Sequence, residues 1–280
     1  MSGSLLNPWP MTRFAATAAA LFGIEKPLDA EPAIGWVADS MRAYVPGPFD
    51  RLFIYNADCV GMWAYRKYPE MFEPVIGRTM LAVPMCSVMP AVTPVNFATM
   101  YTGAAPEVHG IRTYVKPVVR TDTLFDAAVR AGKRTALVSL YEVGSMTRIF
   151  RDRPLDYFVA NSDCESEEIT HRLIHEDRHD VISTYVMDYD YIQHRRGPED
   201  PESLAALRSH MDRFARLIDH IRCAWSAHNT LFVFTSDHGN HAVDLPDKKG
   251  DHGDDIPEDR NVLHFWGCAA ERPHDLSAFR

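Results

Sequence analysis

The stretch DPESLAALRSHMDRFARLIDHIRCAWSAHNTLFVFTSDHGN, residues 200 to 240, decides the fold. Its first part places Asp200 and a proline before apolar residues that recur every three or four positions, which predicts a long amphipathic helix capped by Asp200. The apolar run Thr230–Thr235 comes soon afterwards and predicts a buried strand. Asp237 and His238 then stand just past the end of this strand, so a carboxylate and an imidazole lie where the chain leaves the sheet.

The same alternation of strands and helices continues through the chain. A second helix is predicted from Leu124 to Ala131, because Thr123 and Asp126 can satisfy its first turn and Gly132 can end it. The predicted strands are Arg51–Ala57, Thr79–Val83, Thr135–Leu140, Val181–Met187, Thr230–Thr235 and Val262–Trp266. This order predicts an α/β fold with a doubly wound, mostly parallel sheet flanked by helices, in which ligands bind beyond the carboxyl ends of the strands.

Length and composition limit the classes of protein. The 280 residues include no repeat and no low-complexity segment, and 46% of them are hydrophobic, as in a soluble globular protein. We therefore expect residues 1–280 to form one domain, with residues 1–50 as its N-terminal helical extension. The net charge of −9 argues against binding of duplex nucleic acid, because such binding depends on neutralising phosphates with Lys and Arg. A small phosphate ester stays open as a partner.

The cysteines and the apolar segments bear on the location of the protein. Five scattered cysteines without a CxxC pair favour reduced thiols and hence a cytoplasmic location over a secreted or periplasmic one. The apolar segment Phe14–Ile24 predicts a helix that packs on the domain, with a signal peptide as the alternative. No run approaches the ~18 apolar residues that a membrane span needs, so no membrane partner is expected.

Carboxylates and imidazoles follow several of the predicted strands. Besides Asp237 and His238, the segment after Val181–Met187 carries Asp190 and His194, although chemistry alone leaves Asp188 open as the ligand in place of Asp190. Oxygen and nitrogen ligands of this kind suit Zn²⁺ or Mn²⁺. For each pair the alternative is an ordinary polar turn or a solvated histidine.

Three further residues complete the set. Asp58 closes the strand Arg51–Ala57, and His252 lies in a polar, acidic loop. Thr93 precedes a proline and a short helical segment that Gly103 can end, so it is predicted to be an N-cap residue. The start of a helix also favours a bound phosphate, and a metal ion can activate a hydroxyl there for attack. Together these residues predict a two-metal phosphoryl-transfer site.

Several segments resemble the alkaline phosphatase superfamily, and within it the type I phosphodiesterase/nucleotide pyrophosphatase branch. The segment Pro90-Ala-Val-Thr93-Pro-Val-Asn96, continuing to Tyr101-Thr-Gly103-Ala-Ala-Pro106-Glu-Val-His109-Gly110-Ile111, resembles the nucleophile segment of that branch. Asp190-x3-His194-x2-Gly197-Pro198 and Thr235-Ser-Asp237-His238-Gly239 are similar to its two metal segments. The resemblance extends from about Arg51 to Gly253.

The resemblance implies a role for each residue of the site. It assigns one metal to Asp190, His194 and His252, and the other to Asp58, Thr93, Asp237 and His238. It further implies Thr93 as the nucleophile, Asn96 as a contact to a phosphoryl oxygen, and zinc as the metal, with Mn²⁺ as an alternative. Pro94 lies one place earlier than in the usual family segment, and Phe97 replaces a histidine that many members carry.

The function expected from these features is a metal-dependent phosphohydrolase, most simply a phosphodiesterase/nucleotide pyrophosphatase that forms a phosphothreonine intermediate. A phosphomonoesterase or phosphonate hydrolase with the same site is one alternative, and a non-catalytic metal-binding protein is another. Sulfatases are disfavoured because their Cys/Ser-x-Pro-x-Arg pattern is absent: after Cys86, Val88 and Pro90 occupy the places of its Pro and Arg. Cofactor-independent phosphoglycerate mutases are similar only in the Asp-His-Gly-Asn stretch.

Overall fold

The computed structural model describes residues 5–45, 47–142 and 144–270. Its strands are β1 (Trp9–Pro10), β2 (Arg51–Ala57), β3 (Leu81–Cys86), β4 (Thr135–Leu140), β5 (Asp156–Ala160), β6 (Val181–Val186), β7 (Thr230–Thr235), β8 (His241–Leu245), β9 (Lys248–Asp251) and β10 (Asn261–Ala269). Its helices are α1 (Phe14–Phe22), α2 (Gly35–Arg42), α3 (Met62–Lys67), α4 (Glu73–Ile76), α5 (Thr93–Thr102), α6 (Pro106–His109), α7 (Leu124–Arg130), α8 (Ser145–Ile149), α9 (Asp163–Glu176), α10 (Asp188–Arg196), α11 (Pro201–Ala224) and α12 (Pro257–Arg260).

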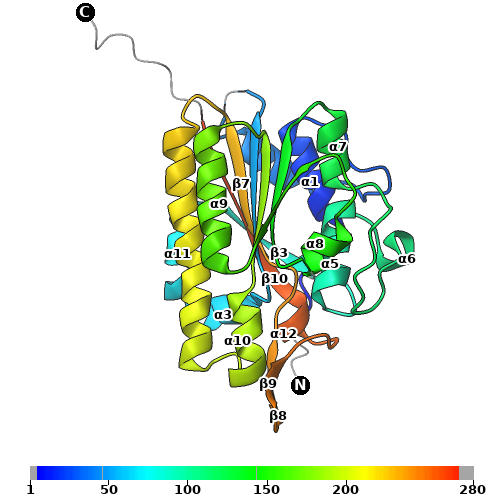
Figure 1. Cartoon of the computed structure of the whole chain (residues 1–280), viewed down its shortest axis with the longest axis vertical. Coiled ribbons are helices and arrows are strands. Elements are labelled where there is room, and N and C mark those ends of the chain that lie inside the picture. Colours follow the sequence, from blue (N-terminus) through cyan, green and yellow to red (C-terminus); the bar gives the residue numbers. More distant parts are fainter. Residues whose placement is uncertain (1–4, 46, 143, 271–280) are drawn as a thin grey trace, which may run out of the picture.

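Eight strands form one central sheet in the order β1-β3-β10-β7-β2-β6-β4-β5. Only β10 is antiparallel to its neighbours, β3 and β7, so the sheet is mostly parallel as predicted. Strand β2 lies between β6 and β7, which places the carboxyl ends of these three strands next to one another. The small hairpin β8–β9 projects from one end of the molecule (Figure 1).

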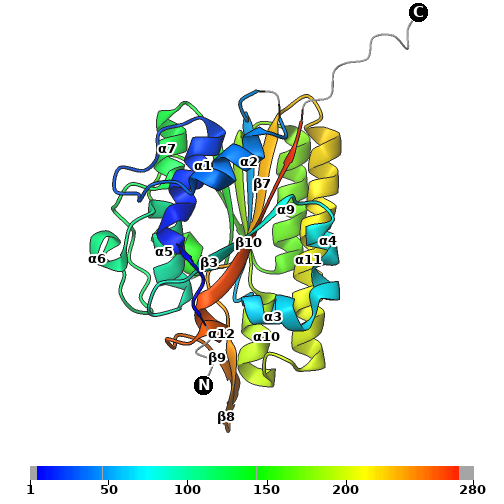
Figure 2. The ribbon, with the colours of Figure 1, turned by 180° about the vertical axis from the view of Figure 1, so that it is seen from behind.

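Helices cover both faces of the sheet. Helices α9 and α11 lie on one face, and α1, α5 and α7 lie on the other (Figures 1 and 2). Apolar side chains form a core layer on each side. The long helix α11 begins as the sequence predicts, since the Asp200 carboxylate accepts the Glu202 N–H at 2.9 Å.

The N-terminal segment joins the same core. Eight of the nine residues of α1 are buried, and α1 packs against α2, α5 and α7. A helix there is predicted from the sequence and is confirmed. The description of residues 1–280 as one domain stays a prediction, and residues 1–4, 46, 143 and 271–280 lie outside the described part. In that part no helix combines the length and hydropathy of a bilayer span.

Some boundaries differ from those predicted. Strand β3 runs from Leu81 to Cys86 instead of Thr79–Val83, and Pro84 lies inside it. Proline is tolerated there because β1 pairs only with Met85 and Cys86, so Pro84 has a strand partner on one side alone, namely Leu263 of β10. Strand β10 is longer than the predicted Val262–Trp266 because it pairs along both β3 and β7.

Candidate metal centre

Six predicted ligands converge at the carboxyl ends of the three central strands. Asp58 follows β2 directly, Asp190 lies in the first turn of α10 after β6, and Asp237 and His238 follow β7. His194 lies one turn further along α10, and His252 lies in the loop after β9. Because the strands β6, β2 and β7 are parallel neighbours, residues more than a hundred positions apart in sequence meet at one edge of the sheet.

The first group of ligands consists of Asp190, His194 and His252. The Nε2 atoms of His194 and His252 lie 3.4 Å and 3.5 Å from the same oxygen, Oδ1 of Asp190. His194 is one helical turn beyond Asp190 in α10, so the helix itself sets their spacing. The sequence left Asp188 open as the ligand, and the structure brings Asp190 into the group instead.

The second group consists of Asp58, Asp237 and His238, all buried. His238 Nε2 lies 3.5 Å from Asp58 Oδ1 and 3.3 Å from Asp237 Oδ2. Both of these carboxylate oxygens are buried without a hydrogen-bond partner. The two groups adjoin, since the rings of His238 and His252 stack with their centroids 3.9 Å apart.

The tautomers of the three imidazoles suit metal binding. The Nδ1 atoms lie 2.9 to 3.0 Å from backbone carbonyl oxygens: Gly250 O for His194, Ala91 O for His252 and Gly239 O for His238. A carbonyl can only accept a hydrogen bond, so each Nδ1 carries the proton and each Nε2 is left as a lone-pair donor. Three lone pairs and two unpartnered carboxylate oxygens thus face one another, a set of atoms that fits divalent cations.

Burial shifts the pKa values of the carboxylates and imidazoles in this centre. Burial, together with the nearby carboxylate of Asp190, raises the pKa of Asp237 to about 7. Burial and the Asp237 carboxylate also raise the pKa of Asp58 well above its usual range. The pKa of His238 and that of His252 are lowered by burial to about 4, so both rings are neutral at pH 7. A bound cation would reverse the penalty on the two carboxylates.

Thr93 lies beside the second group but is not the predicted N-cap. Val92 is the N-cap residue, with extended backbone angles and no side-chain capping bond, and its carbonyl accepts the Asn96 N–H at 3.0 Å. Thr93 is therefore the first helical residue of α5, and its Oγ1 lies 3.3 Å from His238 Nε2. The N-cap prediction is wrong because Pro94, which needs no N–H partner, occupies the second helical position rather than the first.

Asn96 is buried beneath the loop that leads into α5. Its Oδ1 accepts the Val88 N–H at 2.8 Å, and its Nδ2 lies 3.2 to 3.3 Å from the carbonyl oxygens of Val88, Pro90 and Val92. These bonds use the side-chain amide to hold the loop. In this arrangement the donors of Asn96 are directed to the backbone, and its contact to a phosphoryl oxygen, which the resemblance implies, stays a prediction.

Two buried side chains that sequence reasoning missed contact the ligands directly. The Tyr185 hydroxyl donates to Asp58 Oδ2, and Gln193 Nε2 lies 3.3 Å from Asp190 Oδ1. Tyr185 is one of six buried residues of β6, so no local pattern distinguishes it. Gln193 lies between the two ligands of the first group in sequence, which is the only signal that could have identified it.

A buried ion network fixes the start of α10. The two carboxylate oxygens of Asp163 accept the N–H groups of Met187 and Asp188 at 2.9 Å and 3.1 Å. Arg213 and His210 from α11 lie 3.7 Å and 3.5 Å from Asp163. This network sets where α10 begins, and hence where its second turn presents His194.

Two aromatic side chains, Phe97 and Tyr114, differ in burial. Phe97 is buried and packs edge-on against Tyr185, 5.4 Å away, so it lies beneath the site. Tyr114 is exposed, and the pKa of its phenol is raised by burial of the oxygen and then by the carboxylates of Asp58 and Asp190.

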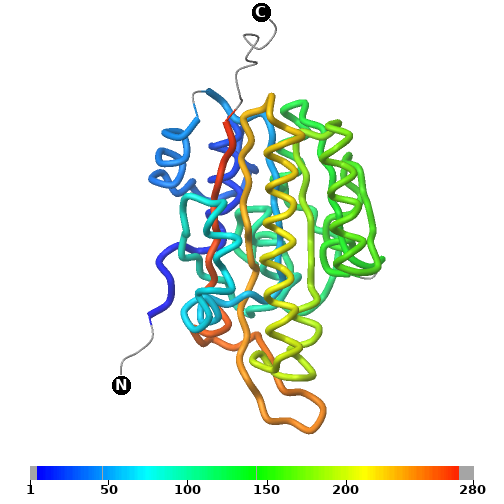
Figure 3. The backbone as a smooth tube through the Cα atoms, turned by 90° about the vertical axis from the view of Figure 1, so that its left-hand side faces the viewer, coloured from blue at the N-terminus to red at the C-terminus, as the bar shows by residue number. Residues whose placement is uncertain are grey.

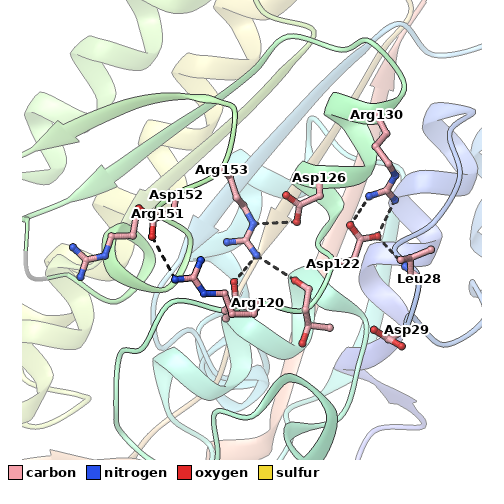
Figure 4. A pocket seen from close by; sticks show the side chains of 11 residues that line it. Leu28, Asp29, Arg120, Asp122, Asp126, Arg130, Arg151, Asp152 and Arg153 are labelled. Atoms are coloured by element: carbon pink, nitrogen blue, oxygen red, sulfur yellow. Dashed lines mark hydrogen bonds and ion pairs between the residues drawn. The ribbon is translucent and has the colours of Figure 1, made fainter.

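A separate cavity of about 540 Å³ opens beside α7 and is lined by none of the six ligands (Figure 4). Arginines and aspartates line it, and they pair with one another: Arg130 with Asp122, Arg153 with Asp126 at 3.0 Å, and Arg120 with Asp152 at 3.7 Å. Because these charges are already balanced, the cavity offers no concentrated positive charge for a phosphate.

Comparisons with known proteins identify the family and the fold. Residues 76–275 match the family model described as type I phosphodiesterase / nucleotide pyrophosphatase. No curated protein matches the sequence. Among solved structures, the inactive murine ectonucleotide pyrophosphatase/phosphodiesterase 5 in complex with AMP is 14% identical, with a TM-score of 0.63 over 78% of this chain and 88% of that chain. The human protein of the same name is also 14% identical, with a TM-score of 0.61 over 79% and 88%. Phosphonoacetate hydrolase from Sinorhizobium meliloti in complex with phosphonoformate is 20% identical, with a TM-score of 0.53 over 71% and 59%.

Proposed function

The chain belongs to the type I phosphodiesterase / nucleotide pyrophosphatase family of the alkaline phosphatase superfamily, and from this premise we propose that it hydrolyses phosphoric diesters with two metal ions and Thr93 as nucleophile. One observation carries the proposal. Three imidazole lone pairs and two unpartnered, buried carboxylate oxygens converge beside a threonine hydroxyl. Such a set of acceptors lacks any function in packing, because buried polar atoms without partners cost free energy.

The two groups of ligands fit two ions. Asp190, His194 and His252 would hold one, and Asp58, Asp237 and His238 would hold the other together with Thr93. We favour zinc, because imidazole and carboxylate ligands suit it, with Mn²⁺ as the alternative. When bound, the ions supply stabilisation of the threonine alkoxide and of the leaving oxygen.

The residues of the chain then account for the steps of the reaction. The Thr93 oxygen loses its proton to solvent, attacks phosphorus and forms a new O–P bond, while the bond from phosphorus to the leaving oxygen breaks and the leaving group departs into solvent. Water hydrolyses the resulting phosphothreonine and restores the hydroxyl. Thr93 is in the first turn of α5, where the helix dipole favours the negative phosphoryl group.

The substrate class is proposed from the structural relatives. The murine relative was studied in complex with AMP, which favours a nucleotide-containing diester or pyrophosphate. The similarity to phosphonoacetate hydrolase keeps a phosphonate substrate, or a phosphomonoester, as the second candidate on the same site.

A hydrolysis panel tests the proposal. Nitrophenyl phosphate mono- and diesters, nucleotides and phosphonates are incubated with the protein in Zn²⁺ and in Mn²⁺. We expect the diesters to have the highest kcat/KM and chelation to abolish turnover. Turnover of phosphonates alone would support the second candidate. If the protein binds the metals but turns over none of these substrates, the result would support the alternative that it is a non-catalytic metal-binding protein.

A further inference from the structure

A cluster of histidines lies on the surface far from the strand ends that form the metal centre. Helices α9 and α11 lie side by side on one face of the sheet (Figures 1 and 3). They run parallel, since Glu167 pairs with Arg216 and, one turn later on both helices, His171 faces His220. His175 follows His171 by one further turn on the same side of α9.

The spacing of His171 and His220 matches that of two histidines in the candidate metal centre. The Nδ1 atoms of His171 and His220 lie 2.8 Å apart, and their ring centroids lie 5.0 Å apart. The rings of His194 and His252 in the metal centre have the same centroid separation of 5.0 Å. The ring of His175 stacks 6.5 Å from that of His220, and its side chain is exposed and free to turn.

The protonation of the cluster also suits a cation. Two facing Nδ1 atoms can share only one proton, so at least one lone pair points into the contact. Burial lowers the pKa of His220, and the neighbouring imidazoles of His171 and His175 lower it further. The carboxylate of Glu167 lies 3.8 Å from His171 Nε2, but its two oxygens are bound by Arg216 at 2.7 Å and 2.9 Å. Imidazoles therefore dominate the ligand set, which selects transition metals over Mg²⁺ and Ca²⁺.

We propose that His171, His175 and His220 form a third metal site, which binds Zn²⁺ or a similar divalent transition metal and links α9 to α11. Two nitrogens on a tetrahedral zinc ion lie about 3.3 Å apart, given Zn–N bonds of about 2.0 to 2.1 Å. The two Nδ1 atoms therefore have to separate by only about half an ångström. His175, whose ring centroid lies 6.5 Å from that of His220, has to turn toward the pair to complete three protein ligands, and solvent supplies the fourth position. The site is independent of the hydrolytic function proposed above.

Zinc titration tests the site, with Zn²⁺ alone as the ligand. Metal-free wild-type protein and the double variant His171→Gln/His220→Gln are loaded with zinc, passed through gel filtration and analysed for metal. We expect the double variant to hold one ion fewer per chain, with unchanged hydrolysis and an unchanged circular dichroism spectrum. Zinc should also raise the Tm of the wild type more than that of the double variant.

Two further variants guard against a folding artefact. His175→Ala changes an exposed side chain and should lower the affinity for the third ion at least about tenfold. Even the loss of a residue that only supports a metal ligand commonly lowers metal affinity by that factor. Glu168→Gln, an exposed change on the same helix, is the matched control and should bind zinc as the wild type does. Equal zinc content and affinity in the wild type and the double variant would overturn the proposal and leave His171 and His220 as a simple hydrogen-bonded pair.

Discussion

The sharpest test of how the metal centre is built is the substitution Gly250→Ala. The Gly250 carbonyl accepts the Nδ1–H of His194 at 3.0 Å and so holds the imidazole with Nε2 toward Asp190. A Cβ at residue 250 would collide with the side-chain oxygen of Gln193 and lie 2.5 Å from the Gln193 backbone oxygen. Ordinary van der Waals contact begins at 3.4 Å, so β9 has to withdraw from α10 by about 0.9 Å.

A withdrawal of this size breaks the bond from His194 to Gly250, because 3.0 Å becomes about 3.9 Å, and a contact at ~3.6 Å is already no hydrogen bond. Loss of an outer-shell partner commonly lowers metal affinity about 10- to 100-fold. We expect that loss for the ion held by Asp190, His194 and His252, and a decrease in stability of about 1 to 3 kcal/mol from overpacking.

Competition of the protein with a zinc chelator measures the affinity, and thermal unfolding of the metal-free protein measures the stability. The matched control is Gly35→Ala, at the first residue of α2, where an added Cβ meets nothing within 4 Å. The control should retain both zinc affinity and stability. Wild-type zinc affinity in Gly250→Ala would refute the reasoning, because the carbonyl would then not be what orients His194.

The remaining predictions concern the ligands and the nucleophile. Thr93→Ala should retain the fold and lose about 10³-fold or more of kcat, and near-normal turnover would identify Thr93 as structural. His252→Ala should weaken zinc binding and regain part of its activity in excess metal. His241→Ala should retain zinc binding and activity, because His241 contacts Asp259 at 2.8 Å and none of the ligands. Loss of zinc binding in His241→Ala but not in His252→Ala would mean that the terminal ligand is the other histidine. Zinc binding should strengthen as pH rises through about 7, because Asp237 has to release its proton before it binds a metal ion. Equal zinc affinities measured below and above pH 7 would contradict this.

The strand ends were predictable because two local signals coincide there. A buried parallel strand reads as a continuous apolar run, and β2, β4 and β7 begin and end where their runs do. Polar residues directly after such runs mark the edge where ligands bind, and this marks Asp58 and Asp237 without knowledge of any contact. The helix α11 is equally clear, because its apolar stripe spans six turns.

The other features depend on contacts that sequence spacing does not report. Tyr185 reaches Asp58 across 127 positions, and His252 reaches Asp190 only because β9 folds back on α10. The strands β8 (HAVDL) and β9 (KKGD) mix charged residues with a few small or apolar ones and present no long apolar run. Asn96 is ambiguous for another reason: the same residue type can bind a phosphoryl oxygen or hold a loop, and only the positions of the neighbouring carbonyls decide between the two.

The centre is poorly suited to stabilise the fold by itself, and this links its stability to its function. Cys59, between Asp58 and the rest of the site, has a left-handed φ of 69°, and its N–H donates to Asp237 Oδ1 at 3.2 Å. The pKa of Asp237 in the folded, metal-free protein is raised to about 7, so its proton stabilises the fold at low pH and that contribution is lost as pH rises through 7. Above that pH the buried carboxylates repel one another unless cations lie between them. The left-handed backbone at Cys59 and the buried carboxylates at one edge of the sheet are therefore best explained as properties of a site shaped for metal ions. At such sites a protein departs from the local backbone and burial preferences that it follows elsewhere.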